Sequence, residues 1–293
     1  MGKVIYTDNI GFDMSDWKNE NIRKVYAGAN CIMALTADGR VLQKVTDREF
    51  AARTEYWKNI TDIAISGCCK GLAIGLVSDG TCMVSKRPLD CFCEKSYDKT
   101  RINDVVKSWS NIVEVATSDA LFALDKYGKV HYVCIRRGYD DYAKTRNWEN
   151  VVHIATGSQN SVFGVTADGR VLAAGGNCVG GALGFLKISH LANLKDAVDV
   201  CAAGSECESI YIAHKDGTVD DLRNKKVVQG CKNSVGVLKG QFNGALIQKA
   251  DGRLEVAPYF GCGDYSGFES YKVSSFAVGN TDYGPLFAIA VTE

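Results

Sequence analysis

The heptapeptide TADGRVL occurs twice in this chain, at 36–42 and again at 166–172. At its centre is an Asp-Gly pair, which favours a tight hairpin turn because glycine readily adopts the positive φ that such a turn requires. Comparable turn glycines recur at intervals of 41, 48, 41, 48 and 35 residues, at Gly39, Gly80, Gly128, Gly169, Gly217 and Gly252. A turn signal with this spacing predicts an architecture of repeated β-sheet units.

Each turn lies inside a pattern of three strands. A segment such as KVYAGA or VHIATG comes first, a second such as IMALT leads into the turn, and a third such as RVLQKV leaves it. Apolar runs bounded by turn residues are typical of strands. The second strand carries a small residue five positions before the turn glycine, at Ala34, Gly75, Ala123 and Gly164. We interpret these small residues as the mark of a crowded centre, on which strands from several units converge.

A tryptophan precedes several units at a fixed place. The pattern Trp-x-Asn followed by Ile or Val begins at Trp57, Trp109 and Trp148, and Trp17 begins a version that is two residues longer. A large aromatic residue at the same station of several units is best explained by packing between neighbouring units. We therefore expect these tryptophans to be structural and not to form a ligand cage.

The two ends of the chain complement each other. The last segment, SSFAVGNTDYGPLFAIAVTE, repeats the first two strands of a unit and stops where the turn is expected. The first residues, Gly2-Lys-Val-Ile5, match the turn glycine and third strand at Gly39-Arg-Val-Leu42. Pairing of the N-terminal strand with the C-terminal strand would complete the last unit and protect sheet edges that an open array exposes.

We therefore predict an all-β fold, a seven-bladed β-propeller closed by pairing of the N- and C-terminal strands. A single domain would span 1–293. Its blades are expected at about 22–56, 60–108, 112–147, 151–190, 197–230, 233–268, and 273–293 plus 1–8.

One stretch resembles the repeat of a known family. TADGRVLAAGGNCVGGALG at 166–184 is similar to the repeat of the regulator of chromosome condensation family, which runs Leu-Thr-x-x-Gly-x-Val-x-x-Trp-Gly-x-Asn-x-x-Gly-Gln-Leu-Gly. The matching tail residues are Gly175, Asn177, Gly180, Leu183 and Gly184. The chain departs from the family because no unit has the His before the second strand and most lack the full glycine tail. The resemblance, to a divergent bacterial-type member, implies a propeller that acts through protein contacts.

Charge and composition exclude several classes of protein. The chain carries 34 basic and 34 acidic residues, so it lacks the basic excess typical of nucleic-acid binding. The N-terminal segment MGKVIYTDNIGFDMSDW does not resemble a signal peptide, and no apolar run is long enough to span a membrane. We expect a cytoplasmic monomer that binds neither membrane nor nucleic acid, with its 12 cysteines reduced.

The sequence contains no recognisable catalytic or metal-binding motif. The nearest groupings, Cys68-Cys69, Cys91-Phe-Cys93 and His131-x-x-Cys134, lack the two well-spaced ligand pairs of a structural zinc site. The histidines fall at different stations of the repeat, and we expect structural roles for His153 and His214. A Cys–His pair brought together by folding stays open as an alternative. We predict no enzymatic activity, no cofactor and no metal.

Function is expected where the units differ, because loops on a rigid scaffold commonly carry binding residues. Two connections, 85–109 and 134–148, are long and rich in charged and aromatic residues. Their candidate partner-binding residues are Phe92, Arg136, Arg137 and Tyr139, since Arg and aromatic residues are favoured in interfaces. The leading hypothesis is a protein-binding scaffold. The alternatives are a guanine nucleotide exchange factor for a small GTPase, with 85–109 as its wedge, and an enzyme-inhibitory propeller.

Overall fold

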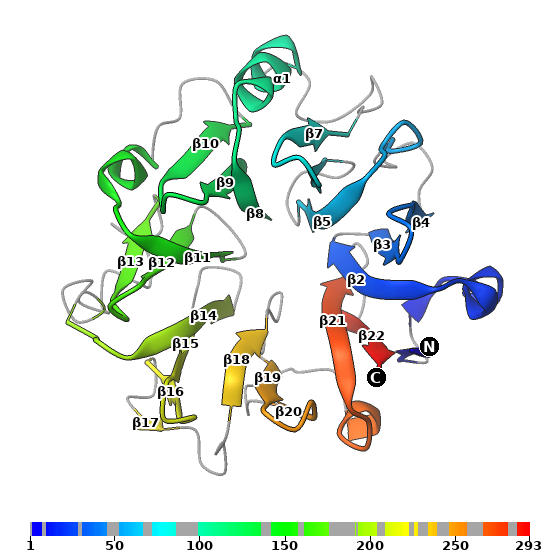
Figure 1. Ribbon diagram of the computed structural model, residues 1–293. Helices are drawn as coiled ribbons and strands as arrows, with labels where there is room; N and C mark the ends of the chain where they lie inside the picture. The colour runs from blue at the N-terminus through cyan, green and yellow to red at the C-terminus, as the bar shows by residue number, and fades with distance from the viewer. Residues whose placement is uncertain are drawn as a thin grey trace.

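The computed structural model describes most of the chain. The described residues are 2–7, 10–28, 31–45, 53–66, 72–85, 99–135, 142–157, 161–175, 191, 193–203, 209–222, 226–227, 234–238, 246–256, 266–280 and 286–293. They form seven antiparallel sheets, which Figure 1 shows arranged around a common centre. The predicted all-β propeller fold is confirmed. Among the described helices, none combines the length and the apolar character needed to cross a membrane.

The sheets follow one another along the chain. The first four consist of β2 (Ile22–Gly28), β3 (Cys31–Thr36) and β4 (Val41–Val45); β5 (Ile60–Ile65), β6 (Ala73–Val77) and β7 (Cys82–Val84); β8 (Ile112–Thr117), β9 (Ala120–Asp125) and β10 (Val130–Cys134); and β11 (Val151–Thr156), β12 (Val162–Thr166) and β13 (Val171–Ala174). The last three consist of β14 (Ala197–Ala203), β15 (Ser209–His214), β16 (Val219–Asp221) and β17 (Lys226–Val227); β18 (Ser234–Leu238), β19 (Leu246–Lys249) and β20 (Leu254–Val256); and β21 (Val273–Asn280), β22 (Leu286–Thr292) and β1 (Val4–Tyr6).

Short helices lie in the connections between sheets. They are the 3₁₀ helices η2 (Ser15–Asn19), η4 (Ala143–Asn147) and η6 (Ser266–Phe268), and the α-helix α1 (Lys99–Lys107). In Figure 1, α1 lies at the periphery of the ring beside β10.

The seventh sheet is built from both ends of the chain. Strand β1 pairs antiparallel with β22, with Val4 opposite Val291 and Tyr6 opposite Ile289. The backbone N–H of Thr292 also donates to the carbonyl of Lys3 at 2.9 Å. The N-terminal segment therefore supplies the third strand of this sheet, and the N and C labels lie close together in Figure 1.

The turn glycines connect neighbouring sheets as well as strands. All six have a φ of +81° to +82°, in the left-handed region that glycine tolerates best. At Gly80 and Gly128, the carbonyl accepts a hydrogen bond from the first strand of the next sheet, at 2.9 Å from Ile112 and 3.2 Å from Val151. The carbonyls of Gly169 and Gly252 accept equivalent bonds from the next sheet. These glycine turns thus also join neighbouring units.

The small residues of the second strands make room for the tryptophans. A Cβ built at Gly75 would lie 2.9 Å from the ring of Trp57, and one at Gly164 would lie 3.0 Å from the ring of Trp148. All four tryptophans are buried. At Gly75 and Gly164 the interpretation of the small residue as a sign of convergence at the ring centre is therefore wrong. The crowding comes from the indole of the same unit, packed against its own second strand.

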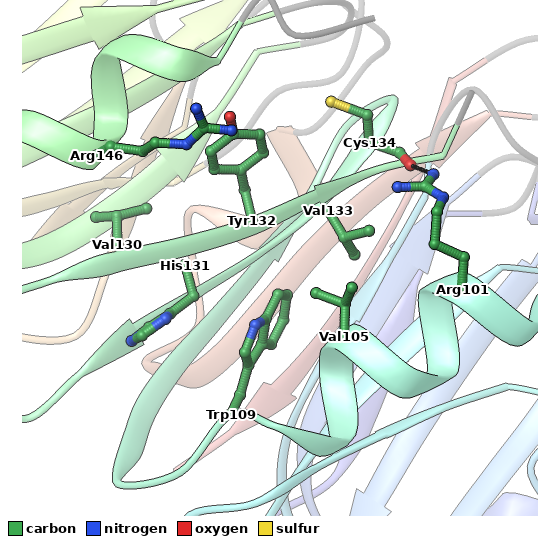
Figure 2. Close-up of a pocket in the computed structure, with 9 residues that line it drawn as sticks. All are labelled: Arg101, Val105, Trp109, Val130, His131, Tyr132, Val133, Cys134 and Arg146. Carbon is green, nitrogen blue, oxygen red and sulfur yellow. Dashed lines mark hydrogen bonds between the residues drawn. The ribbon is translucent and has the colours of Figure 1, made fainter. Parts of the chain in front are cut away.

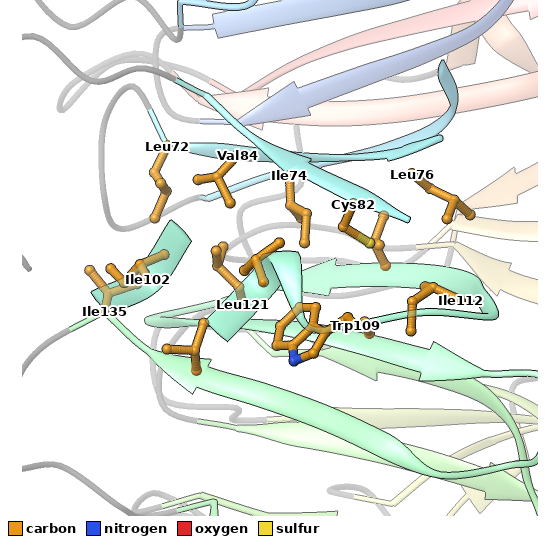
Figure 3. Packing of buried hydrophobic residues seen from close by; sticks show 14 residues of the cluster. Leu72, Ile74, Leu76, Cys82, Val84, Ile102, Trp109, Ile112, Leu121 and Ile135 are labelled. Carbon is orange, nitrogen blue, oxygen red and sulfur yellow. The ribbon is translucent and has the colours of Figure 1, made fainter. Parts of the chain in front are cut away.

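The core is divided into clusters that lie between neighbouring sheets. The cluster in Figure 3 joins the second and third sheets, with Leu72 and Ile74 on one side and Leu121 on the other. Helix α1 contributes Ile102 to this cluster, and Trp109 fills its centre. Burial of these side chains supplies the main driving force that holds one sheet against the next.

Candidate functional site

The described halves of the two long connections flank the same outer strand. Helix α1 belongs to connection 85–109 and η4 belongs to connection 134–148. Between them, β10 forms the floor of an open pocket of about 390 Å³. Figure 2 shows the lining side chains, with Arg146 and Arg101 at opposite ends and Trp109, Val105 and Val133 between them.

Helix α1 is fixed by one apolar face. Ile102, Val105 and Val106 are spaced by three and four residues, so they lie on one side of the helix. Ile102 and Val106 are buried in the cluster between the second and third sheets. This packing directs Arg101 toward β10, where its Nη2 donates to the carbonyl oxygen of Cys134 at 2.6 Å. The guanidinium is therefore held at one end of the pocket.

Helix η4 positions the second arginine. Thr145 is buried and its hydroxyl donates to the carbonyl of Tyr142 at 2.8 Å, which fixes the start of the turn. Arg146 is exposed, and its guanidinium lies 5.4 Å from the centroid of the Tyr132 ring. A cation over an aromatic face is attracted by the ring quadrupole. Stacking on Tyr132 therefore orients Arg146 toward the pocket.

The aromatic residues beneath Tyr132 form a rigid support. The ring of Tyr142 contacts Phe122 edge-on at 4.9 Å between centroids and Tyr132 at 6.1 Å. The Tyr142 hydroxyl donates to Asp119 and lies 3.3 Å from the hydroxyl of Ser118. Burial, followed by the nearby Asp119 carboxylate, raises the pKa of Tyr142, so its hydroxyl stays protonated and remains a donor.

His131 also lines the pocket, and Asp125 holds its ring in a fixed orientation. Nε2 of His131 lies 2.9 Å from Oδ2 of Asp125, and its ring lies 6.1 Å from that of Trp109. Burial of Asp125 disfavours its charge, but hydrogen bonds from His131 and from the backbone N–H groups of Lys129 and Tyr127 outweigh this and lower its pKa. Asp125 therefore stays ionised and fixes the histidine ring.

His131 and Cys134 do not form a metal or nucleophile pair in this arrangement. They lie three residues apart on β10, so their side chains point to opposite faces of the sheet. The Cys134 thiol is buried in the cluster between the third and fourth sheets. Within the described part of the chain, no three His, Cys, Asp or Glu side chains gather as a metal site would require.

The pocket is basic at both ends and apolar in the middle. Helices α1 and η4 together carry five basic residues and one acidic residue, in a chain whose net charge is zero. Arginine binds carboxylates through two parallel hydrogen bonds, and Trp109 and Val105 offer an apolar surface. The arrangement therefore suits a ligand with negative charge at its ends and an apolar group between them.

The four residues proposed from the sequence, Phe92, Arg136, Arg137 and Tyr139, lie outside the described residues. So do Cys68, Cys69, Cys91, Cys93 and His190. The two connections singled out from the sequence flank this pocket, and its lining includes Arg101, Tyr132 and Arg146, which were not proposed from the sequence. Arg101 and Arg146 lie in short helices and Tyr132 lies on β10, and only the folded arrangement distinguishes them from ordinary solvated residues.

A second group of polar residues links neighbouring sheets. Every sheet has an irregularity in pairing near the start of its first strand, and the residue just after it is polar in six of the seven. These residues are Lys24, Asp62, Glu114, His153, Asp199 and Ser275, with Gly236 in the sixth sheet.

His153 links three sheets through this group. Its Nδ1 lies 2.8 Å from Oε1 of Glu114, and its Nε2 lies 2.8 Å from Oδ1 of Asp199. Burial disfavours the imidazolium, but hydrogen bonds to Asp199 and Glu114 outweigh this and raise the pKa of His153 to about 10. His214 is buried, with Nδ1 3.0 Å from Asp196 and Nε2 3.3 Å from Asp220. Both histidines thus connect strands.

Comparison with known proteins supports the fold and leaves the activity open. No family model matches the chain, and no curated protein matches it in sequence. Prp20p from Saccharomyces cerevisiae is similar in structure, with a TM-score of 0.63 and 13% identity, over 96% of this chain and 83% of that one.

Two further solved structures show the same similarity. Yeast RCC1 (Prp20), in a complex with Kap60, has a TM-score of 0.61 and 12% identity over 96% of this chain and 81% of its own. Human WBSCR16 has a TM-score of 0.62 and 11% identity over 94% of this chain and 88% of its own. At these identities the chain shares the propeller fold of these proteins, as the repeat resemblance implied. A shared fold does not by itself establish a shared activity.

Proposed function

We propose that this chain is a non-enzymatic scaffold that binds a protein partner through the outer surface of its third sheet. The observation that carries the proposal is the convergence of Arg101 and Arg146, which come from the two connections that do not repeat. They lie at the two ends of one pocket over β10. Residues placed on opposite sides of a rigid strand can recognise a partner without reorganising the scaffold.

Charge complementarity favours an acidic segment of the partner. Arg101 of α1 and Arg146 of η4 lie at the two ends of an apolar centre, and the pocket is open to solvent. A partner segment with carboxylates on either side of an apolar side chain would satisfy both features. Arg and aromatic residues in a partly buried setting commonly carry most of the binding energy of an interface.

Proteins of the same fold also bind other proteins. The solved structure of Prp20p was described together with its binding to Gsp1p and histones, and yeast RCC1 was solved in a complex with Kap60. These partners belong to those proteins, and the fold similarity supports only the general class of function. Nucleotide exchange ranks second because α1, the described part of 85–109, packs against the second and third sheets through Ile102 and Val106 and does not project as a wedge.

Two charge reversals test the proposal. Arg146→Glu changes an exposed residue, so the fold should be retained, and Arg101→Glu changes the other end of the pocket. The matched control is Arg253→Glu, which alters an exposed arginine on the sixth sheet. Proteins captured by the wild-type chain would be identified and purified. Their affinity would then be measured for the wild type, the two pocket variants and the control variant. We expect each pocket variant to raise the Kd by about ten-fold or more, with no change in the control.

Other outcomes would redirect the proposal. Equal affinity of the wild-type chain and both pocket variants would exclude the third sheet as the contact surface. Release of fluorescent GDP from a captured GTPase would establish the exchange alternative, and loss of activity in a captured enzyme would establish inhibition. Turnover of a small molecule by the purified chain would overturn the assignment as a non-enzymatic protein.

A further inference from the structure

A second pocket lies where the first strands of several sheets approach one another. It has a volume of about 220 Å³ and is separate from the pocket over β10. Four sheets line it: the first through Lys24 and Tyr26, the second through Asp62, the sixth through Gln248 and the seventh through Ser275 and Phe276. The site therefore exists only when the ring is assembled.

Hydrogen bonds hold part of this lining in place. Oδ1 of Asp62 accepts from the hydroxyl of Tyr26 at 2.7 Å and from Nζ of Lys24 at 3.1 Å. Oγ of Ser275 accepts from the backbone N–H of Val25 at 3.0 Å. Burial, followed by the charge of Asp62, raises the pKa of Tyr26, so the Tyr26 hydroxyl remains a donor to that carboxylate. The first, second and seventh sheets are fixed relative to one another at this place.

The same residues retain hydrogen-bonding capacity toward the pocket. Among the described residues, Oδ2 of Asp62 and the side-chain amide of Gln248 have no hydrogen-bond partner. The Lys24 ammonium has three N–H groups, of which one is directed to Asp62, and Ser275 can still donate its hydroxyl proton. Donors and acceptors thus face the same small volume, next to the ring of Phe276.

The chemistry of this lining selects among ligand classes. Lys24 and Asp62 neutralise each other, so the pocket has no excess charge that would favour a free anion or cation. A zwitterion would have to separate these two side chains, which costs the hydrogen bond between them. Hydroxyl groups both donate and accept, so they can bridge Lys24, Asp62 and Gln248 without breaking that pair. An aromatic ring beside them can cover the C–H face of a cyclic polyol.

From this arrangement we infer that the pocket between the first, second, sixth and seventh sheets binds a small polyhydroxylated molecule of monosaccharide size. Gln248 would contribute the amide that both donates and accepts, and Asp62 would accept from a ligand hydroxyl through Oδ2. Binding of this molecule is independent of the partner-binding surface on the third sheet, because the two pockets share no lining residue.

Ligand-observed NMR can test the inference with the full chain. Glucose, galactose and N-acetylglucosamine would each be presented at millimolar concentration, and saturation transfer from protein to sugar would be recorded. We expect transfer to at least one sugar, with millimolar affinity. Gln248→Leu removes the amide at nearly constant volume and should weaken binding at least about five-fold, which is the effect of losing a hydrogen bond between the half-buried amide and the ligand.

Two controls separate this inference from the proposed function. Arg101→Ala should leave sugar binding unchanged, and Gln248→Leu should leave partner capture unchanged. Thermal melting of each variant verifies that the ring is still folded. Absence of transfer to all three sugars, or transfer of equal strength in Gln248→Leu, would overturn the inference. Alanine serves as the zwitterionic probe, and preferential binding of alanine would equally contradict a polyol site.

Discussion

The ring of Trp57 occupies the space beside the α-carbon of Gly75, so that an added Cβ at Gly75 would lie 2.9 Å from Cζ3 of the indole and 3.1 Å from Cδ1 of Ile60. We predict that Gly75→Ala destabilises the protein, because both neighbours are buried and have little room to move. Overpacking of this kind costs about 1–3 kcal/mol in the free energy of unfolding. Urea denaturation would measure the change.

The matched control for this substitution is Gly267→Ala. No atom lies within 4 Å of the position that its Cβ would take, so its free energy of unfolding should stay close to that of the wild type. Combining Gly75→Ala with Trp57→Phe should cost less than the sum of the single changes, since the smaller ring relieves the contact. Strictly additive effects would show that the two residues are not coupled.

The turn glycines should differ in their tolerance of asparagine. Asn adopts the left-handed region more easily than other residues with a side chain. At Gly39 the nearest atom to an added Cβ is 3.5 Å away, so Gly39→Asn should cost less than about 1 kcal/mol. At Gly169 an added Cβ would lie 2.4 Å from the backbone of Lys195, so Gly169→Asn should cost at least about 2 kcal/mol.

Thermal melting of the two asparagine variants compares them directly. An equal loss of stability at both positions would mean that the left-handed φ alone limits substitution. The expected difference instead reflects the joint between the fourth sheet and the fifth, where the Gly169 carbonyl accepts from Ala197 at 3.1 Å.

Stability should depend on pH through His153. Its pKa is raised from 6.5 to about 10 by its carboxylate partners, against the effect of burial. Because the folded state holds the proton more tightly than the unfolded state, this contribution is complete below pH 6.5 and declines as pH rises toward about 10. His153→Gln cannot carry the charge, so its stability deficit relative to the wild type should be largest below pH 6.5 and should shrink toward pH 10.

Melting temperatures of both proteins across this range would measure the effect. Below pH 6.5, where His153 is charged in both the folded and the unfolded protein, we expect His153→Gln to lose about 1–3 kcal/mol, because Glu114 and Asp199 lose a shared cation in a partly exposed setting. A deficit that stays constant from pH 6.5 to about 10 would contradict the role of the imidazolium.

Two buried cysteines should be unreactive in the folded protein. Burial raises the pKa of Cys31 to about 11, against a weaker opposite effect of Gln43, and burial raises the pKa of Cys82 to about 12. The thiolate is the reactive form, so it is scarce at neutral pH. Cys31→Ser and Cys82→Ser should therefore leave the number of thiols that react with a disulfide reagent in the native protein unchanged. Each should lower the number in denaturant by one.

The architecture was readable from the sequence because backbone requirements repeat. Turn glycines such as Gly39 and Gly169 face the same φ in every unit, and the match between Gly2-Lys-Val-Ile5 and Gly39-Arg-Val-Leu42 anticipated the pairing of β1 with β22. The role of Gly75 was misread, since a small residue indicates crowding without naming the neighbour that crowds it.

The sites were harder to predict because they depend on contacts between units. Lys24 in KVYAGA, Asp62 in DIAISG and His153 in VHIATG occupy equivalent positions of the repeat. Nothing in one unit showed that Glu114, His153 and Asp199 would meet across three sheets. Arg101 and Arg146 lie 45 positions apart, and only the placement of α1 and η4 beside β10 brings them to one pocket.

The pairing of β1 with β22 also sets an order of events for folding. The other six sheets are assembled from strands that are close neighbours in the sequence, so each can form soon after it is synthesised. Strand β1 precedes every other described strand in the sequence, yet its partner β22 follows all of them, with 289 positions between Lys3 and Thr292. The nascent chain must therefore carry β1 without its partner until β22 has been synthesised. The seventh sheet can therefore be completed, and the ring closed, only after β22 has been translated.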